Sequence, residues 1–91
     1  MVGCLAISKA GHDKGAVYVI LKEEERSVYL ADGTGKTAAC PKKKNKKHIQ
    51  MLKNGLQGTP AEAVRRKLES RQPVTDEEIK YALKQYQKEL Q

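Results

Sequence analysis

The chain has 91 residues, with no tryptophan or phenylalanine and only four tyrosines, so it can build one small and mainly aliphatic core. This length excludes the large catalytic folds and leaves room for a small barrel or bundle. The 18 lysines and arginines outnumber the 11 aspartates and glutamates, and the net charge of +7 makes a polyanion, nucleic acid before an anionic membrane surface, the first partner to consider.

The sequence predicts a soluble protein of the cytoplasm. No apolar run reaches the length of about 18 residues that spans a bilayer, and the N-terminus lacks the basic region and apolar run of a secretory signal. Two cysteines, Cys4 and Cys40, are too few for the disulfide framework of a small secreted domain. We expect both to be reduced thiols.

Residues 2–53 are predicted to form short strands, because β-branched and aliphatic runs alternate there with turn residues. The apolar run over 16–21 predicts a central strand that is covered on both faces. Charged residues over 22–26 and two glycines within 32–35 predict reversals, the second of them a tight hairpin. Strands at intervals of about ten residues favour a small closed or nearly closed barrel, since closure removes exposed edges. Four further strands, the third of them weak, are expected over 5–8, 27–31, 36–39 and 48–52.

From residue 59 the pattern changes to that of helices. Residues 59–62 read Thr-Pro-Ala-Glu, a capping box with proline at the first helical position, and predict a helix that runs to about Arg71 and stops before Pro73. A second capping box over 75–78 begins a second helix. We expect the apolar stripe of this helix to pack on the barrel, with binding of a partner helix as the alternative. The stripe consists of Ile79, Leu83, Tyr86 and Leu90.

Positive charge is concentrated in one segment. Between residues 36 and 53 there are seven lysines and no acidic residue, which equals the whole net charge of +7. A solvated lysine loop is one interpretation. A phosphate-binding surface is the other, and the sequence around the segment favours it. The seven are Lys36, Lys42, Lys43, Lys44, Lys46, Lys47 and Lys53.

The loop after the first predicted strand is the most informative stretch. Gly11 and Gly15 permit backbone conformations that are closed to other residues, and they leave room for a ligand to approach closely. Side-chain donors surround these glycines, on Lys9, His12 and Lys14. Such a loop fits a sugar–phosphate backbone, and an ordinary turn is the alternative.

No catalytic site, metal site or cofactor is predicted. The run Gly-Thr-Gly-Lys-Thr over 33–37 looks like the end of a P-loop, but Leu30 replaces a glycine of that motif and Pro41 follows too soon for its helix. The cysteines and histidines lack the close pairs of a zinc site, and no nucleophile has a marked orienting base. The three glutamates over 23–25 fit a solvated hairpin better than an acid–base pair. We therefore expect that the protein is not an enzyme.

The glycine loop also carries a family resemblance. Residues 11–15, Gly-His-Asp-Lys-Gly, followed by the apolar run over 16–20, resemble the KOW motif, with Gly15 at the position of its hallmark glycine. Together with the Pro-Lys-rich segment over 41–50 and the tail over 74–84, nearly the whole chain is similar to short bacterial KOW-domain RNA-binding proteins. These are related to the KOW-bearing large-subunit ribosomal proteins of archaea and eukaryotes.

The resemblance implies a fold that is mainly β with C-terminal helices: an SH3-like KOW barrel over 1–56, then two short helices over 57–91 that pack on it. It also implies binding of structured RNA, ribosomal RNA first, by a ribosomal or ribosome-associated protein of translation. Two features depart from the family pattern. His12 stands where lysine or arginine is usual, and residues 37–40 are more apolar than expected.

We therefore expect a non-catalytic protein that recognises folded RNA through its phosphates and shape. Base stacking should contribute little, because the barrel needs Tyr18 and Tyr29. The alternative is a protein-interaction adaptor of the transcription or translation machinery, with ribosomal proteins among its partners; no small-molecule substrate is expected. The expected RNA contacts are Lys9, Gly11, His12, Lys14, Gly15, Lys36, Lys42, Lys43, Lys44, Lys46, Lys47, His48 and Lys53.

Overall fold

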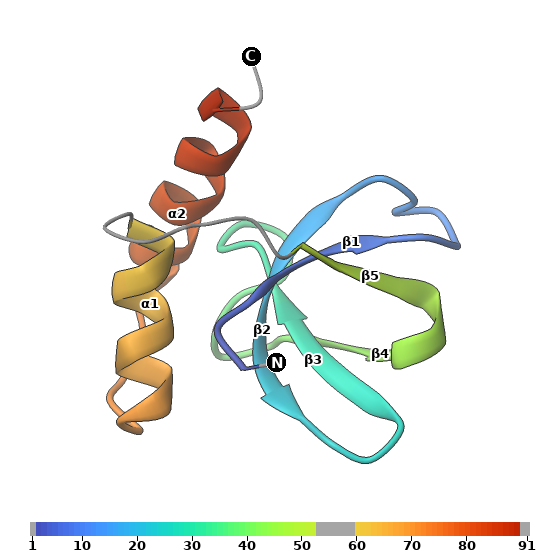
Figure 1. Ribbon diagram of the computed structural model, residues 1–91, viewed down its shortest axis with the longest axis horizontal. Coiled ribbons are helices and arrows are strands. Elements are labelled where there is room, and N and C mark those ends of the chain that lie inside the picture. Colours follow the sequence, from blue (N-terminus) through green and yellow to red (C-terminus); the bar gives the residue numbers. More distant parts are fainter. Residues whose placement is uncertain (1, 53–59, 90–91) are drawn as a thin grey trace.

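The computed structural model describes residues 2–52 and 60–89, and side chains within 2–52 and 63–85. The fold is mainly β with C-terminal helices, as predicted (Figure 1). No helix within the described ranges is long and apolar enough to cross a membrane. In chain order the elements are β1 (Leu5–Ser8), β2 (Val17–Glu23), β3 (Ser27–Ala31), β4 (Lys42–Asn45), the 3-10 turn η1 (Lys46–His48), β5 (Ile49–Leu52), α1 (Pro60–Glu69) and α2 (Asp76–Glu89).

The five strands form one antiparallel sheet in the order β4-β3-β2-β1-β5. β2 lies in the middle, and its successive residues Tyr18, Val19 and Ile20 are all buried, so the predicted central strand is covered on both faces. The edge strands β4 and β5 are linked through η1 (Figure 1). Within residues 2–52 the strand pairing leaves the sheet open between these two edges.

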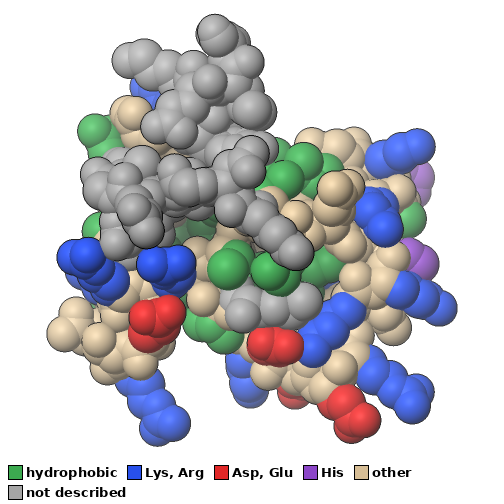
Figure 2. Space-filling model, viewed as in Figure 1, with side chains coloured by type: hydrophobic (Ala, Val, Ile, Leu, Met, Phe, Trp, Pro, Cys, Tyr) green, Lys and Arg blue, Asp and Glu red, His purple; other side chains and the backbone are tan. Residues whose placement is uncertain are grey.

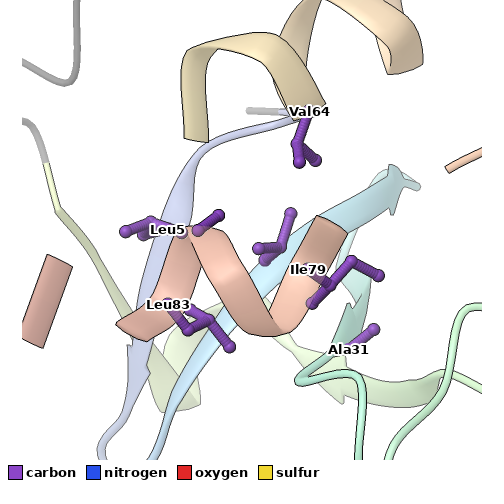
Figure 3. Close-up of a cluster of buried hydrophobic side chains, with 7 residues drawn as sticks. Leu5, Ala31, Val64, Ile79 and Leu83 are labelled. Carbon is purple, nitrogen blue, oxygen red and sulfur yellow. The ribbon is translucent and has the colours of Figure 1, made fainter. Parts of the chain in front are cut away.

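The sheet separates two hydrophobic cores, because alternate residues of each strand point to opposite faces. One core is made by strand residues alone: Ala6, Tyr18, Ile20, Val28, Leu30 and Ile49. The other combines strands and helices: Leu5, Val19, Ala31, Val64, Ile79, Ala82 and Leu83 (Figure 3). The helices therefore cover one part of the sheet, and the β1–β2 loop and η1 lie at the opposite end of the molecule (Figure 1).

The second helix behaves as its capping box and apolar stripe predict. The Thr75 hydroxyl accepts a hydrogen bond from the Glu78 N–H at 3.2 Å, and the Glu78 carboxylate accepts one from the Thr75 N–H at 3.2 Å. Ile79 and Leu83 are buried in the core between sheet and helices. The other two residues of the stripe fall outside the described side chains: Tyr86 and Leu90.

The first helix begins at Pro60, as predicted, and ends at Glu69. Beyond it, Arg71 adopts the left-handed conformation, with φ of 58°, and the Gln72 N–H donates to the Lys67 carbonyl at 2.7 Å. This bond satisfies a carbonyl of the last turn, so an arginine takes the place that glycine usually fills at a helix end. The capping residue Thr59, the Glu62 side chain, and the predicted division between 56 and 57 lie outside the described residues.

The prediction of a weak strand over 36–39 is wrong. The fourth strand is β4, among the lysines that follow. One Asp32 carboxylate oxygen accepts from the N–H groups of Thr34 and Lys36, both at 2.9 Å, and the Ala38 N–H donates to Asp76 at 2.7 Å. Carboxylates thus take the backbone donors that a strand would have used in its ladder. The segment becomes an irregular loop that α2 holds at its N-terminus.

Candidate nucleic-acid interface

The β1–β2 loop has the backbone geometry that its glycines predict. Gly11 and Gly15 have φ angles of 88° and 91°, which residues with a side chain rarely adopt. A Cβ atom at Gly15 would meet no atom of the described residues within 4 Å beyond its chain neighbours, so this part of the loop surface is open toward the described residues. Two backbone bonds close the loop: Gly15 N–H to the Ser8 carbonyl and Ala16 N–H to the Asp13 carbonyl, each at 2.9 Å.

Asp13 ties this loop to the strands beneath it. Its two carboxylate oxygens accept from the ammonium groups of Lys44 at 2.8 Å and Lys42 at 3.0 Å. The Tyr18 hydroxyl donates to Asp13 at 2.8 Å, and the Ser8 hydroxyl lies 2.9 Å from the same carboxylate. The Asp13 side chain is only 15% exposed, so the loop's one carboxylate serves internal contacts.

These contacts shift the pKa values of Asp13 and Tyr18. The Lys44 hydrogen bond is the main cause that holds the pKa of Asp13 far below its usual range; bonds from Lys42, Tyr18 and Ser8 act in the same direction and partial burial opposes them. Burial, together with the bond to Asp13, raises the pKa of Tyr18 to about 12. The carboxylate therefore stays ionised and the phenol stays protonated around neutral pH.

Lys44 is an internal residue of the loop. Its side chain is 10% exposed, and its ammonium donates to Ser8 Oγ at 2.7 Å, to the Ala10 carbonyl at 2.9 Å and to Asp13 Oδ1 at 2.8 Å. An ammonium group has three N–H bonds, so these acceptors use all of them. Lys44 has no donor left for a phosphate in this arrangement, whereas Lys42 is 35% exposed.

Two further lysines of the segment, Lys43 and Lys46, also meet carboxylates. Lys43 lies 3.3 Å from Glu24, and Lys46 lies 2.7 Å from Glu23. Hydrogen bonding to Glu24 raises the pKa of Lys43, and the bond from Lys46 lowers the pKa of Glu23. Sequence reasoning missed these acids because it counted charge only along the segment. The β2–β3 hairpin brings them beside it, and the only sequence signal is the glutamate triplet over 23–25.

Five of the predicted contact residues gather at the end of the sheet that the helices leave uncovered. Lys9, His12 and Lys14 are exposed on the β1–β2 loop, and Lys47 is exposed on η1 beside the half-buried His48. The Lys9 N–H donates to the His48 carbonyl at 2.7 Å, which fastens the loop to η1. Figure 2 shows basic and histidine side chains at this right-hand end of the molecule, with acidic side chains lower in the view.

We call these five residues the cationic end: Lys9, His12, Lys14, Lys47 and His48. No acidic side chain of the described residues forms an ion pair with its three lysines. The structure thus brings together five of the predicted contacts beside the loop glycines. Lys36 lies apart from them in the loop after β3, next to Asp32. Lys53 lies outside the described residues.

The tyrosines described by the structure lie away from the cationic end or are buried. Tyr18 is 3% exposed and belongs to the core. Tyr29 is half-buried on β3, with the ammonium groups of Lys22 and Lys43 at 5.5 and 5.8 Å from its ring centre. Tyr81 is exposed, but on α2. The described part of the cationic end therefore offers charge and hydrogen-bond donors without an exposed aromatic ring.

A groove on the helices is lined by Ala63, Glu77, Glu78 and Tyr81. Lys67, 2.6 Å from Glu78, lowers the pKa of that glutamate together with Thr75. This lowered pKa keeps the Glu78 carboxylate ionised at neutral pH, whereas a general acid needs a raised pKa to keep its proton. Within the described ranges no three histidine, cysteine, aspartate or glutamate side chains gather as a metal site.

Comparison with known proteins places the chain in no family. No protein-family model matches it, and a search of curated proteins finds no significant match. The resemblance to KOW-domain proteins therefore stays a prediction.

Proposed function

We propose that the chain is a non-catalytic RNA-binding protein, ribosomal or ribosome-associated, that grips the phosphates of structured RNA. The observation that carries this proposal is the cationic end, where exposed lysines with no acidic partner among the described residues flank a glycine loop that is open at Gly15. On and next to β4, the ammonium groups of Lys42, Lys43, Lys44 and Lys46 already face Asp13, Glu23 or Glu24. A phosphate therefore meets least competition at the cationic end.

The chemistry of this surface favours folded RNA over single strands. Lysines neutralise phosphates and release condensed counterions, so the affinity should fall steeply with salt. Proteins that hold unpaired bases commonly use exposed aromatic rings, and the described residues of the cationic end have none. Ribosomal RNA is the first ligand to test, because it supplies closely spaced phosphates on a fixed shape.

The first test replaces Lys9, Lys14 and Lys47 together by glutamine. Binding of a ribosomal RNA hairpin should weaken by about 30-fold or more at low salt, and the slope of log affinity against log salt should become shallower by about 2 to 3, since each phosphate contact contributes about 0.7 to 0.9. The measurement is fluorescence anisotropy over a salt series, with an unstructured oligonucleotide of equal length as the weaker competitor.

A matched variant changes three exposed lysines elsewhere to glutamine: Lys22, Lys80 and Lys84. It removes the same charge from β2 and α2, so the salt slope should change by less than about one contact. Equal losses in both variants would show that only the total charge matters and would refute the assignment to the cationic end. Crosslinking in cells and co-sedimentation with the large ribosomal subunit then identify the RNA.

The alternative function, a protein-interaction adaptor, has less exposed apolar surface on α2 than the sequence predicts. A partner helix would need the apolar stripe of α2, but Ile79 and Leu83 are buried against the sheet. The one specific observation in its favour is Tyr81, which is 55% exposed in the groove beside Ala63. If the change Tyr81→Ala abolished co-sedimentation with ribosomes and left RNA affinity intact, the adaptor would replace the RNA-binding proposal.

A further inference from the structure

The Asp13 carboxylate under the glycine loop lowers the positive charge of this end, which a site that bound RNA by charge alone would not need. Asp13 is the one acidic residue of the β1–β2 loop, and it lies between Lys42 and Lys44 at the end of the molecule that is otherwise most basic. A neutral residue at position 13 would remove a negative charge from beside Lys42 and Lys44 and make this end more attractive to a polyanion. Attraction of RNA alone therefore gives no reason for an aspartate at this place.

The geometry gives a different reason. Lys44 reaches from β4 and donates both to the Ala10 carbonyl and to the Asp13 carboxylate, on the two sides of Gly11 and His12. Tyr18 of β2 donates to the same carboxylate. The loop is thus fastened from below at two points, while the residues between these points face solvent.

We propose that Asp13 and Lys44 are positioning residues for RNA, which hold the β1–β2 loop in the one conformation that presents Lys9, His12 and Lys14 to the phosphates. This inference rests on the proposed function. An exposed loop with two glycines would otherwise lose conformational freedom on binding, and that loss weakens affinity. With the loop ordered in advance, the same lysines bind more tightly, although Asp13 and Lys44 contact no RNA themselves.

The change Asp13→Asn separates the two accounts by the sign of its effect. It keeps the size of the side chain and adds one unit of positive charge, so electrostatic attraction alone predicts tighter RNA binding with a steeper salt slope. The positioning role predicts binding about tenfold weaker, because the loop must be ordered when RNA binds. The matched control is Glu24→Gln, which adds the same charge beside the exposed Lys43 and should tighten binding slightly.

A second pair of variants changes no charge. Tyr18→Phe removes only the hydroxyl that donates to Asp13, and it should weaken RNA binding about threefold with an unchanged salt slope. Tyr81→Phe, on the exposed face of α2, is its control and should bind as the unchanged protein does. Hydrogen exchange at the amides over 9–15 should become faster in Tyr18→Phe and stay unchanged in Tyr81→Phe.

All variants are compared at a temperature at which thermal denaturation shows them folded; if Asp13→Asn does not fold, the Tyr18→Phe pair decides. The inference is overturned if Asp13→Asn tightens binding as Glu24→Gln does, or if Tyr18→Phe binds RNA and protects its loop amides like the unchanged protein. Absence of salt-dependent RNA binding in the unchanged protein would refute the proposed function itself, which is a separate result.

Discussion

Asp13 accepts hydrogen bonds from side chains of three strands, β1, β2 and β4. These bonds make the stability of the fold depend on the protonation of one carboxylate. Lys44, Lys42, Tyr18 and Ser8 stabilise its charged form, so its pKa is lower in the folded chain than in the unfolded one. The single residue therefore links the stability of the fold to pH.

The sign of this link follows from proton binding. Between the unfolded pKa of an aspartate, about 3.9, and the lower folded value, the unfolded chain binds more protons. The contribution of Asp13 to stability is therefore fully present above about pH 4 and is lost progressively as the pH falls below it. Urea denaturation of the unchanged protein between pH 2 and 7 should show this decline.

Asp13→Asn supplies the control for the acid experiment. At pH 7 it should lower the free energy of unfolding by about 2 to 4 kcal/mol, because it leaves the nearly buried Lys44 without its countercharge. The difference in free energy of unfolding between the variant and the unchanged protein should become smaller below about pH 4, where Asp13 begins to be protonated in the unfolded chain. A gap that stays constant down to pH 2 would contradict the role given to this carboxylate.

At the scale of elements, the segment before β1 and helix α1 meet at a glycine. Gly3 has φ of 83°, and a Cβ atom there would lie 2.7 Å from the Arg65 Cα, a backbone atom that cannot move aside alone. Its N–H donates to the Ile20 carbonyl at 2.7 Å, so the glycine is also fixed to β2. The helix can approach the sheet this closely only because position 3 has no side chain.

Gly3→Ala should therefore lower the free energy of unfolding by about 3 kcal/mol, from the clash with α1 and the strained backbone together. Chemical denaturation measures the loss. Gly35→Ala, where no atom of the described residues beyond the chain neighbours lies within 4 Å of the added methyl group, should change stability by less than about 0.5 kcal/mol. RNA affinity of folded Gly3→Ala should be unchanged, since the cationic end is remote from this contact; equal stability of the two variants would contradict the packing argument.

The sequence predicts those elements whose signals are local. The apolar run of β2 and the capping box at Thr75 are confirmed, because each depends on neighbours within a few residues. β4 was missed because lysine and asparagine are poor strand formers, and its place depends on pairing with β3 and on the carboxylates that receive its side chains. The glycine loop was predicted from composition, whereas the cluster around Asp13 depends on a contact with Lys44 that is distant in sequence.

At the scale of the whole molecule, the total charge and its placement have different consequences. The net charge of +7 equals the number of lysines between 36 and 53, yet four of those lysines face carboxylates from other parts of the chain. The molecule measures 32 by 30 by 22 Å. Its two longer dimensions are about three times the screening length, which is about 10 Å at 0.1 M salt. A charge on the helices therefore acts weakly on a ligand at the opposite end.

Two variants with the same added charge test whether placement governs binding. His12→Lys puts a lysine on the exposed loop of the cationic end, and Gln72→Lys puts one on the exposed connection between the helices. At 0.1 M salt, His12→Lys should strengthen RNA binding by about fivefold, and over a salt series it should steepen the salt slope by about 0.7 to 0.9, which is one more phosphate contact. Gln72→Lys should change affinity by less than about twofold, because screening separates it from the bound RNA. If both variants gained equally, the protein would be attracting RNA through its net charge, and the cationic end would have no special part in the contact.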